Sequence, residues 1–485
     1  MSDTDTRVAS ILSGPSGPRV AAFFDFDGTL IDGFSATAFL RGAGIPLHRL
    51  LGAALGHGPI PLLRRLSVTR LARPCAEPDD ADIRFAHEVA IRIGRGMTED
   101  ELAEIAERVF TERIAARLRP EMWSLVQAHQ RMGHRVVIVT AATRWQVGPL
   151  AARLGIEDVL CSDPAIEPPL RGGAKAVAVL EFATEHAIDL VASHAYADAG
   201  DDLPFLEACG NPCAVSPRHA LAAAARARGW QILHLDQPAG PGPVTAVRSA
   251  AAWNAVLTGV VAGLGLAATG LERREAAELG MAVASRGCLE LAGVRISLQG
   301  GAHLAVRPAV FLFNHQSWLD VAVMARLLRR DYTGFAKDEL SRVPILADFG
   351  RSLDVVFVDR GAIGAGSDYF APVLDLLSRG VSVAVAPEGT RSRTPMPGPF
   401  RKGAFLAARR AGVPVVPVVI RNTGRLMPRG SRLIRAGQVD VVVHPPVDTT
   451  RWRIAELGER IEELRGLYID TLTTGRPCAA VAVSR

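Results

Sequence analysis

An uncharged stretch of 21 residues, AAWNAVLTGVVAGLGLAATGL, occupies positions 251–271 of this 485-residue chain. As a helix it would be about 31 Å long, which matches the roughly 30 Å hydrocarbon core of a bilayer. The whole chain is too long for one hydrophobic core, because single cores stop growing near about 250–300 residues. We therefore predict two folded domains joined by an apolar helical element.

The segments around this stretch set the expected domain limits. The Pro- and Gly-rich run DQPAGPGPVTAV precedes it and is typical of a linker. A second, weaker apolar helix, interrupted by Arg286, follows it. We predict an N-terminal tail, a first domain, a linker, apolar anchor helices and a second domain at residues 1–19, 20–235, 236–249, 250–284 and 285–485.

The net charge of +5 hides an asymmetry between the two halves. Residues 1–240 contain 24 Lys and Arg against 29 Asp and Glu, whereas residues 241–485 contain 31 against 21. A basic half beside an apolar stretch favours anionic lipids or phosphorylated substrates. No nucleic-acid partner is expected, because the sequence has no helix-turn-helix, zinc-finger or aromatic-interleaved basic pattern. Six scattered cysteines and an N-terminus without an apolar signal segment favour a reduced, cytosolic setting.

Both halves alternate strand-like and helix-like runs. VAAFFDFDG and HRVVIVTAAT are strand-like in the first half, and AVFLFN, VSVAVAPEG, VPVVPVVI and VDVVVHPP are strand-like in the second. Helical patterning lies between them. We therefore predict an α/β fold for each half.

The run FFDFDGTLI places two carboxylates, Asp25 and Asp27, at the end of a buried strand. Carboxylates at i and i+2 on a strand point the same way and repel each other unless a cation lies between them. A Mg²⁺ ion would relieve the repulsion and hold a phosphate beside a carboxylate nucleophile. The alternative is that D-x-D-G only caps a turn.

Three further segments place polar residues at strand ends or turns, in order along the chain. VVIVT ends in Thr140, whose hydroxyl can bind a phosphate oxygen, and Lys175 follows a Gly-Gly turn, where its ammonium can neutralise the same phosphate. The run YADAGDDLPFL supplies Asp198 and Asp202 as hard oxygen ligands. Because α/β sheets place their sites at strand ends, we expect these residues to meet there.

These motifs over residues 20–235 resemble the haloacid dehalogenase-like (HAD) phosphatases, most closely the phosphoserine-phosphatase-like subgroup. The resemblance implies a Rossmann-like domain with a helical cap at about residues 33–118. It also implies hydrolysis of a phosphomonoester whose identity the cap does not reveal. Asp25 would be the nucleophile that forms an aspartyl-phosphate, and Asp27 the general acid/base, with its backbone carbonyl on Mg²⁺. Phosphate binding is implied for Thr140 and Lys175, and metal binding for Asp25, Asp27, Asp198 and Asp202.

The run FLFNHQSWLD carries a second candidate pair, His315 and Asp320. The two side chains can meet if a helix begins near Ser317. The carboxylate would then fix the imidazole tautomer and stabilise its cation, so that His315 can remove a proton from a substrate hydroxyl. The alternative is a structural, hydrogen-bonded histidine.

Two later strands end in residues suited to anion binding. The expected strand in VVFVDRG ends with Arg360, and the expected strand in VAPEGTRS ends with a short Glu-Gly-Thr-Arg block. Arginines bind phosphate in a bidentate manner, and a turn-rich block can present backbone N–H groups to an anion. Surface salt bridges are the alternative for each residue taken singly. The candidate phosphate-binding set is Arg360, Glu388, Gly389, Thr390 and Arg391.

The ordered blocks NHQSWLD, VDRG, PEGTRS and VPVVPV, over residues 285–450, resemble the glycerolipid acyltransferases, in particular the 1-acylglycerol-3-phosphate acyltransferases. The resemblance implies acyl transfer from acyl-CoA or acyl-carrier protein to lysophosphatidate, with His315 and Asp320 activating the acceptor hydroxyl. Glycerol-3-phosphate or another lysolipid stays open as the acceptor. Another alternative makes the first half a non-catalytic dimerisation or regulatory module, and a homodimer is among the expected assemblies.

The apolar stretch is expected to bind membrane lipids. A single span would put the two catalytic halves on opposite faces, although thioesters, Mg²⁺ and reduced cysteines suit both to the cytoplasmic side. We therefore predict a two-helix anchor that dips into one leaflet. A true span and a buried soluble helix remain the alternatives.

Overall fold

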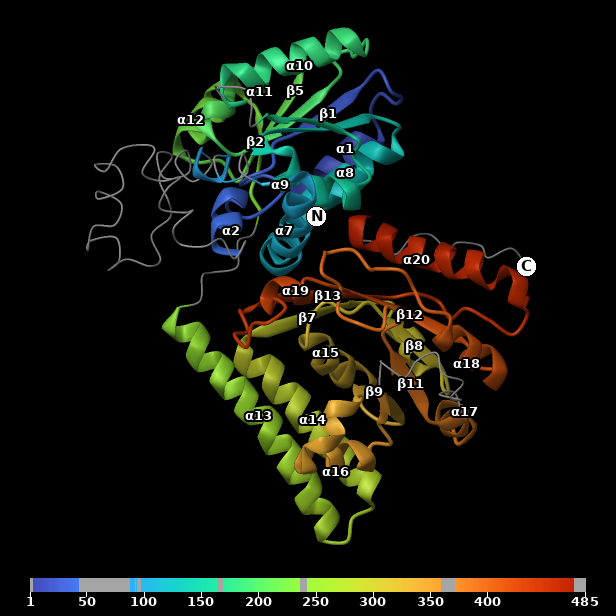
Figure 1. Cartoon of the computed structure of the whole chain (residues 1–485). Helices are drawn as coiled ribbons and strands as arrows, with labels where there is room; N and C mark the ends of the chain where they lie inside the picture. Colours follow the sequence, from blue (N-terminus) through green and yellow to red (C-terminus); the bar gives the residue numbers. More distant parts are fainter. Residues whose placement is uncertain are drawn as a thin grey trace. The chain divides into compact units, whose positions relative to one another are not determined.

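The structure is a computed structural model of the whole chain (Figure 1). It describes residues 3–42, 88–91, 93, 97–163, 169–235, 242–358 and 371–474. The chain divides into two compact units, the N-terminal unit Met1–Asp236 and the C-terminal unit Gln237–Arg485. Each unit is built on a largely parallel sheet with helices, which confirms the predicted α/β class.

The N-terminal unit contains a six-stranded sheet in the order β3-β2-β1-β4-β5-β6, and every pairing in it is parallel. The central strands β1 and β4 are buried along their whole length. Strands covered on both faces are apolar without alternation, which explains the run VAAFF. The strands are β1 (Ala21–Phe24), β2 (Arg135–Thr143), β3 (Asp158–Ser162), β4 (His194–Ala197), β5 (Asn211–Val215) and β6 (Gln231–Leu233).

Side chains from both faces of this sheet are packed. On one face Phe23 lies in a core with Phe182 and Phe205. Because successive strand residues point to opposite faces, Phe24 lies on the other side, where it stacks on Tyr196 with 4.5 Å between ring centroids. This packing holds the carboxyl ends of the strands in fixed positions. The helices are α1 (Asp3–Leu12), α2 (Ser35–Gly42), α7 (Glu99–Val109), α8 (Pro120–Arg131), α9 (Arg144–Leu154), α10 (Gly173–Glu185), α11 (Leu203–Glu207) and α12 (His219–Arg228).

The described part of the predicted cap is mostly helical. It contains α2, α7, a π-helical turn at Phe110–Ile114 and a 3-10 turn at Ala115–Arg117. Helix α7 starts with a capping box, in which Thr98 Oγ1 accepts from the Glu101 N–H at 3.3 Å and Glu101 accepts from the Thr98 N–H at 2.9 Å. Residues 43–87 of the predicted cap lie outside the described residues.

A buried polar network joins α1 to the amino-terminal side of the sheet. The Pro15 carbonyl only accepts, so His134 donates to it from Nε2 at 2.7 Å. A neutral His134 then accepts at Nδ1 from His129 at 2.8 Å, and His129 Nε2 accepts from the Tyr196 hydroxyl at 2.9 Å. Arg7 completes the network, donating to the Tyr196 oxygen at 3.3 Å and to His194 Nδ1 at 3.1 Å.

The three histidines of this network approach closely enough to hold a metal ion. However, the Arg7 guanidinium already supplies a positive charge at this place, and neutral imidazoles satisfy each of the hydrogen bonds. We therefore assign the network a structural role, which is to attach α1 to the sheet.

Acid should destabilise the N-terminal unit through His194. Burial, followed by the electrostatic effect of Arg7 and of His134, lowers its pKa to about 3. In the unfolded chain this histidine has a pKa of about 6.5, so it becomes protonated at a higher pH than in the folded unit. The free energy of unfolding is therefore at its full value above the pKa of the unfolded chain. It falls as the pH is lowered from there towards pH 3, by up to about 1.4 kcal/mol per pH unit.

Urea unfolding at several pH values, for the wild type and His194→Asn, measures this effect. The asparagine offers Arg7 an acceptor oxygen but does not titrate, so its acid loss should be shallower. His129 and His134 also face this ring and are unchanged in the variant. Equal pH slopes for the two proteins would contradict the assignment.

The C-terminal unit contains a seven-stranded sheet in the order β10-β9-β11-β8-β12-β13-β7. Strands β12 and β13 pair antiparallel, and the other pairings are parallel. The strands are β7 (Val294–Gln299), β8 (Val310–Phe313), β9 (Tyr332–Lys337), β10 (Val356–Val358), β11 (Ser382–Val385), β12 (Val415–Arg421) and β13 (Gly437–Val443). The helices that follow or cover them are α15 (Leu319–Leu328), α16 (Pro344–Ser352), α17 (Ala371–Ser378), α18 (Gly403–Ala411), α19 (Thr423–Leu426) and α20 (Leu457–Thr474).

The apolar stretch forms a helical hairpin of α13 (Pro243–Ala268) and α14 (Arg273–Ala292). The two helices touch through glycines: a Cβ on Gly259 would lie 2.4 Å from the Gly280 carbonyl oxygen. The predicted linker differs from the structure, because α13 already begins within it. Proline at Pro243 fits the first turn of a helix, where its missing N–H costs nothing.

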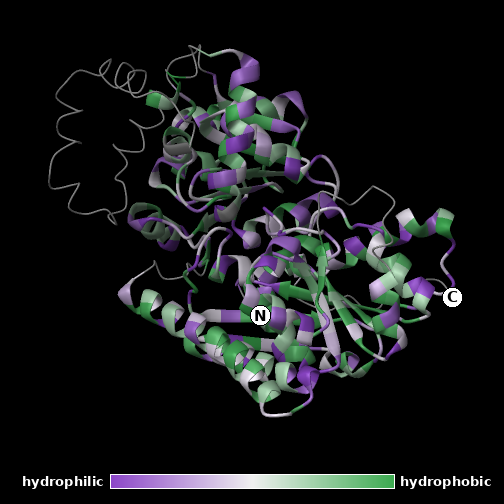
Figure 2. Cartoon of the chain, turned by 60° about the horizontal axis from the view of Figure 1, so that its bottom comes forward, coloured by the Kyte–Doolittle hydropathy of each residue, from purple (hydrophilic) through white to green (hydrophobic). Residues whose placement is uncertain are grey.

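The outer side of the hairpin exposes apolar side chains, and much of the hairpin is green in Figure 2. Leu257 and Val261 of α13 are 54% and 53% exposed. By length and composition α13 could cross a membrane, and among the described helices it alone meets that test. A helix in the core of a soluble protein would be mostly buried, whereas only 22% of the apolar window of α13 is buried.

Candidate functional sites

The first site lies at the carboxyl ends of β1 and β4. Asp25 directly follows β1 and Asp198 directly follows β4, and Asp202 ends a 3-10 turn after it. Lys175, in the first turn of α10, donates to Asp25 Oδ1 at 2.7 Å and to Asp202 Oδ1 at 2.6 Å. Oxygen atoms of the three carboxylates approach closely enough to hold one metal ion. Residues far apart in the sequence therefore meet at one edge of the sheet.

Asp27 lies in the same cavity, but its carboxylate points to the start of the cap. It accepts from the Ser35 N–H at 2.6 Å and from the Ser35 hydroxyl at 2.9 Å. The three carboxylates that could share one ion are those of Asp25, Asp198 and Asp202, and Asp27, which was expected to contact the ion through its backbone carbonyl, lies beside them. Gly28 lets the chain turn here, since its φ is +81° and a Cβ would lie 2.3 Å from Asp198 Oδ2.

A cavity of about 70 Å³ brings all six predicted residues of this half together: Asp25, Asp27, Thr140, Lys175, Asp198 and Asp202. Arg218, which the sequence did not single out, lies at its rim with Nε 3.7 Å from Asp198 Oδ2. Thr29 was also missed, although it follows Asp25 by four residues. Its hydroxyl lies 3.4 Å from oxygens of both Asp25 and Asp198.

Burial makes this group of charges unstable without a cation. It raises the pKa of Asp198 to about 8 and that of Asp27 to about 7. It also raises the pKa of Asp25 to about 6, although Lys175 opposes that rise. For Lys175, burial acts to lower the pKa, but Asp202 and Asp25 outweigh it and raise the pKa.

The residues of this site fit a divalent cation. The buried carboxylates of Asp25, Asp198 and Asp202 outnumber the one buried ammonium, which leaves negative charge to be neutralised. Carboxylate oxygens are the ligands that Mg²⁺ takes in proteins. When bound, such an ion would neutralise this charge and draw a phosphate group to the cavity.

The second site lies at the carboxyl end of β8. The Asn314 side chain exchanges two hydrogen bonds with the backbone of Ile420 in β12, at 2.8 Å and 2.7 Å, which fixes the chain just before His315. Ser317 anchors the following turn through a hydrogen bond from its hydroxyl to the Met427 carbonyl at 2.8 Å. Helix α15 begins two residues later, at Leu319.

His315 and Asp320 meet as a pair. His315 Nδ1 lies 2.8 Å from Asp320 Oδ2, which also accepts the backbone N–H groups of Gln316 at 2.7 Å and Ser317 at 2.9 Å. Asp320 is fully buried, whereas the His315 side chain is 16% exposed. An ionised carboxylate only accepts, so the proton of the neutral ring sits on Nδ1 and the Nε2 lone pair is left for a substrate.

Glu388 holds the backbone of His315 in place. Its Oε1 accepts the His315 N–H at 2.9 Å, and its Oε2 accepts the Gly398 N–H at 2.9 Å and the Ser392 hydroxyl. Burial raises the pKa of Glu388, and these three hydrogen bonds oppose the rise. The structure thus gives Glu388 a positioning role in place of the predicted contact with phosphate.

The structure describes three of the four remaining predicted residues of this half. Gly389 has a φ of +70°, and a Cβ there would lie 2.8 Å from Arg401 Nε, so the turn needs glycine. Thr390 follows it, and the Arg391 guanidinium lies 5.4 Å from the centre of the Trp318 ring, next to the catalytic turn. Arg360 lies outside the described residues.

The two sites and the two sheets define an enzyme built of two α/β units. The model of the haloacid dehalogenase-like hydrolases matches residues 22–207, and that of the acyltransferases matches residues 295–421. The N-terminal unit therefore carries a haloacid dehalogenase-like hydrolase domain, and the C-terminal unit carries an acyltransferase domain.

Acyltransferases are among the proteins that are similar to this chain. A chloroplastic 1-acyl-sn-glycerol-3-phosphate acyltransferase of Brassica napus is 35% identical over 31% of this chain and 46% of its own length. An inhibition of morphological differentiation protein of Streptomyces azureus is 31% identical over 46% of this chain and 80% of its own. The solved 1-acyl-sn-glycerophosphate acyltransferase of Thermotoga maritima is 23% identical, with a TM-score of 0.42 over 47% of this chain and 95% of its own. The chain spans about half the length of the first acyltransferases that it matches.

Proposed function

We propose that the C-terminal unit transfers an acyl group from acyl-CoA or acyl-carrier protein to lysophosphatidate, giving phosphatidate. The observation that carries this proposal is the His315–Asp320 pair, with its Nε2 lone pair free on a half-exposed turn. His315 Nε2 takes the proton of the acceptor hydroxyl while the hydroxyl oxygen attacks the thioester carbonyl carbon. The thiolate then leaves and takes the proton from His315. Asp320 stabilises the cationic ring between these two transfers.

The acceptor phosphate binds beside this pair. Arg391, which lies next to Trp318 and two residues after the tight turn at Gly389, supports a phosphate site there. Arg360 belongs to the same proposal on its sequence motif alone. Glycerol-3-phosphate and other lysolipids carry similar hydroxyl and phosphate groups, so the acceptor assay includes them.

We further propose that the N-terminal unit hydrolyses a phosphomonoester in the presence of Mg²⁺. An Asp25 carboxylate oxygen attacks phosphorus, and Asp27 protonates the departing alkoxide. Water then attacks the aspartyl-phosphate, with Asp27 taking its proton. Lys175 holds the Asp25 carboxylate in place and supplies positive charge beside it. The observation that supports this order of reaction steps is that these residues and Thr140 line one cavity.

Both reactions are tested by product analysis with the full chain. Lipid products are followed with lysophosphatidate and acyl-CoA, and released phosphate with a panel of phosphomonoesters. Variants that disable one site each separate the two activities. If no phosphomonoester is hydrolysed, the N-terminal unit is a scaffold or regulatory module.

We also propose that the α13–α14 hairpin attaches the chain to the cytoplasmic face of a membrane. The exposed apolar residues of α13 support this, because Leu257 and Val261 lie one turn apart on the same side. Membrane burial of one large apolar side chain contributes roughly 1.5–3 kcal/mol, which is about ten- to a hundredfold in binding.

Leu257→Glu/Val261→Glu should therefore weaken binding to phospholipid vesicles by at least about tenfold. Flotation of the full chain with phosphatidylcholine and phosphatidylglycerol vesicles measures this. Ile454→Glu, at a position 68% exposed in the same unit, is the matched control and should float like the wild type. Equal flotation of the hairpin variant and the control would rule out this attachment.

A further inference from the structure

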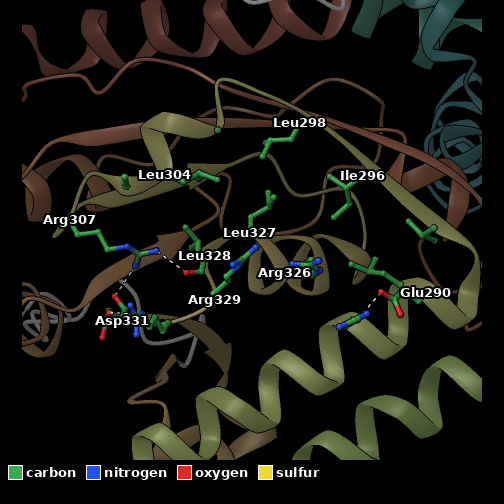
Figure 3. Close-up of a pocket in the computed structure, with 16 residues that line it drawn as sticks. Glu290, Ile296, Leu298, Leu304, Arg307, Arg326, Leu327, Leu328, Arg329 and Asp331 are labelled. Atoms are coloured by element: carbon green, nitrogen blue, oxygen red, sulfur yellow. Dashed lines mark hydrogen bonds and ion pairs between the residues drawn. The ribbon is translucent and has the colours of Figure 1, made fainter.

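A groove of about 1040 Å³ lies in the C-terminal unit, away from His315. It is bounded by the end of α14, by β7, by the turn Gly301–Ala305 and by the end of α15 (Figure 3). Arg307 lies three residues before the start of β8 and Asp331 directly precedes β9, whereas His315 follows β8. The groove and the catalytic pair therefore lie at opposite ends of these strands and form separate sites.

One side of the groove is apolar. Ile296 and Leu298 alternate along β7 and so share one face of this edge strand. Leu304 and Leu327 complete the apolar lining, and Figure 3 shows these side chains around one space. Leu298 is 43% exposed, so this apolar surface is open and reachable.

The other side is basic, with five lining arginines against one Glu and one Asp. Three of the arginines are engaged within the fold. Arg286 pairs with Glu290 at 2.8 Å, and Arg330 Nε lies 3.8 Å from Asp331 Oδ2. Arg307 donates to the Leu328 carbonyl at 2.9 Å at the end of α15. The groove thus keeps an excess of positive charge after its internal pairs are formed.

Arg326 and Arg329 are the arginines left for a ligand. Within the described parts of the chain, neither side chain has an ion-pair or hydrogen-bond partner, and Figure 3 shows both beside Leu327. Arg329 has a φ of +65°, a conformation that costs a residue with a side chain about 1–3 kcal/mol. The alternative is that the two arginines only stabilise the end of α15, and cations at a helix end contribute only about 0.3–1 kcal/mol. That contribution explains neither the strained backbone of Arg329 nor the apolar residues on the opposite side of the groove.

We infer that this groove binds one anionic phospholipid, with its phosphate on Arg326 and Arg329 and an acyl chain along Ile296, Leu298 and Leu304. The volume is at the upper end of the range of small-ligand pockets, which suits a chain and a headgroup. A single residue separates the end of α14 from the start of β7, so the groove adjoins the proposed membrane-binding element. The inference rests on the proposed membrane association and is independent of acyl transfer.

Photolabelling of the full chain tests this site. The probe is phosphatidylglycerol with a diazirine in its acyl chain, present in phosphatidylcholine vesicles, and the labelled peptides are mapped. We expect label within residues 294–305, competed by unlabelled phosphatidylglycerol but not by inorganic phosphate, which lacks the chain. Arg326→Gln/Arg329→Gln should lower this label by about tenfold, because two charge-assisted contacts are lost.

Two comparisons make the outcome decisive. Arg295→Gln/Arg451→Gln removes the same charge from exposed positions, Arg295 being on the other face of β7, and should keep the label. Label on α13 reports membrane attachment separately. The inference is overturned if residues 294–305 stay unlabelled while α13 is labelled, if the double variant keeps the label, or if inorganic phosphate competes. Absence of label on α13 as well would instead contradict membrane attachment and, with it, the inference.

Discussion

His315→Ala should nearly abolish acyl transfer, with kcat lowered by about a hundred- to ten-thousandfold. The hydrogen bond to Asp320 fixes the tautomer of this ring and leaves its Nε2 lone pair open to substrate. Without it, the acceptor hydroxyl must attack the thioester while keeping its proton. The measurement is the initial rate of phosphatidate formation, with phosphate release by the same preparation as an internal check on folding.

The carboxylate partner should matter almost as much. Asp320→Asn keeps an oxygen for the N–H groups of Gln316 and Ser317 but can no longer stabilise the cationic ring. We expect kcat to fall while KM for lysophosphatidate changes little, because neither residue binds the phosphate. His303→Ala, a change at a partly buried histidine of the same unit, is the control. A His315→Ala protein that keeps more than a tenth of the wild-type rate would contradict the mechanism.

Motifs at strand ends made much of both sites predictable. Parallel strands bring their carboxyl ends to one edge, so Asp25, Thr140 and Asp198 could be placed together without knowing the contacts between them. The pairing of His315 with Asp320 followed from a separation of five residues across a helix start. In both cases a local pattern carries the information.

The features that the sequence did not reveal depend on long-range contacts. Glu388 lies 73 positions from His315, whose N–H it accepts, and nothing in the PEGTRS block distinguishes that role from anion binding. Lys175 could be assigned to phosphate, but not to a bridge between two carboxylates. The Arg7 network needs partners up to 224 positions away. The start of α13 at Pro243 was hidden because proline and glycine mark linkers and helix starts alike.

Asp25→Asn should abolish phosphomonoester hydrolysis, by at least about a thousandfold, and leave acyl transfer unchanged. An amide oxygen is a poor nucleophile towards phosphorus. The fold should survive, because asparagine can still accept from Lys175 and the change removes one of three clustered negative charges. The measurement is phosphate release in the presence of Mg²⁺. Chelation of the ion should also stop the wild-type reaction, since the remaining carboxylates would then repel the substrate.

The covalent step gives this prediction a second readout. With a labelled phosphomonoester, rapid acid quenching should trap labelled phosphate on the wild-type chain and none on Asp25→Asn. Asp158→Asn, which removes a carboxylate paired with Arg135 outside the cavity, should label normally. Label that survives in Asp25→Asn would place the nucleophile elsewhere. A wild type that hydrolyses substrate without ever trapping label would favour direct attack by water, with Asp25 acting only through its charge.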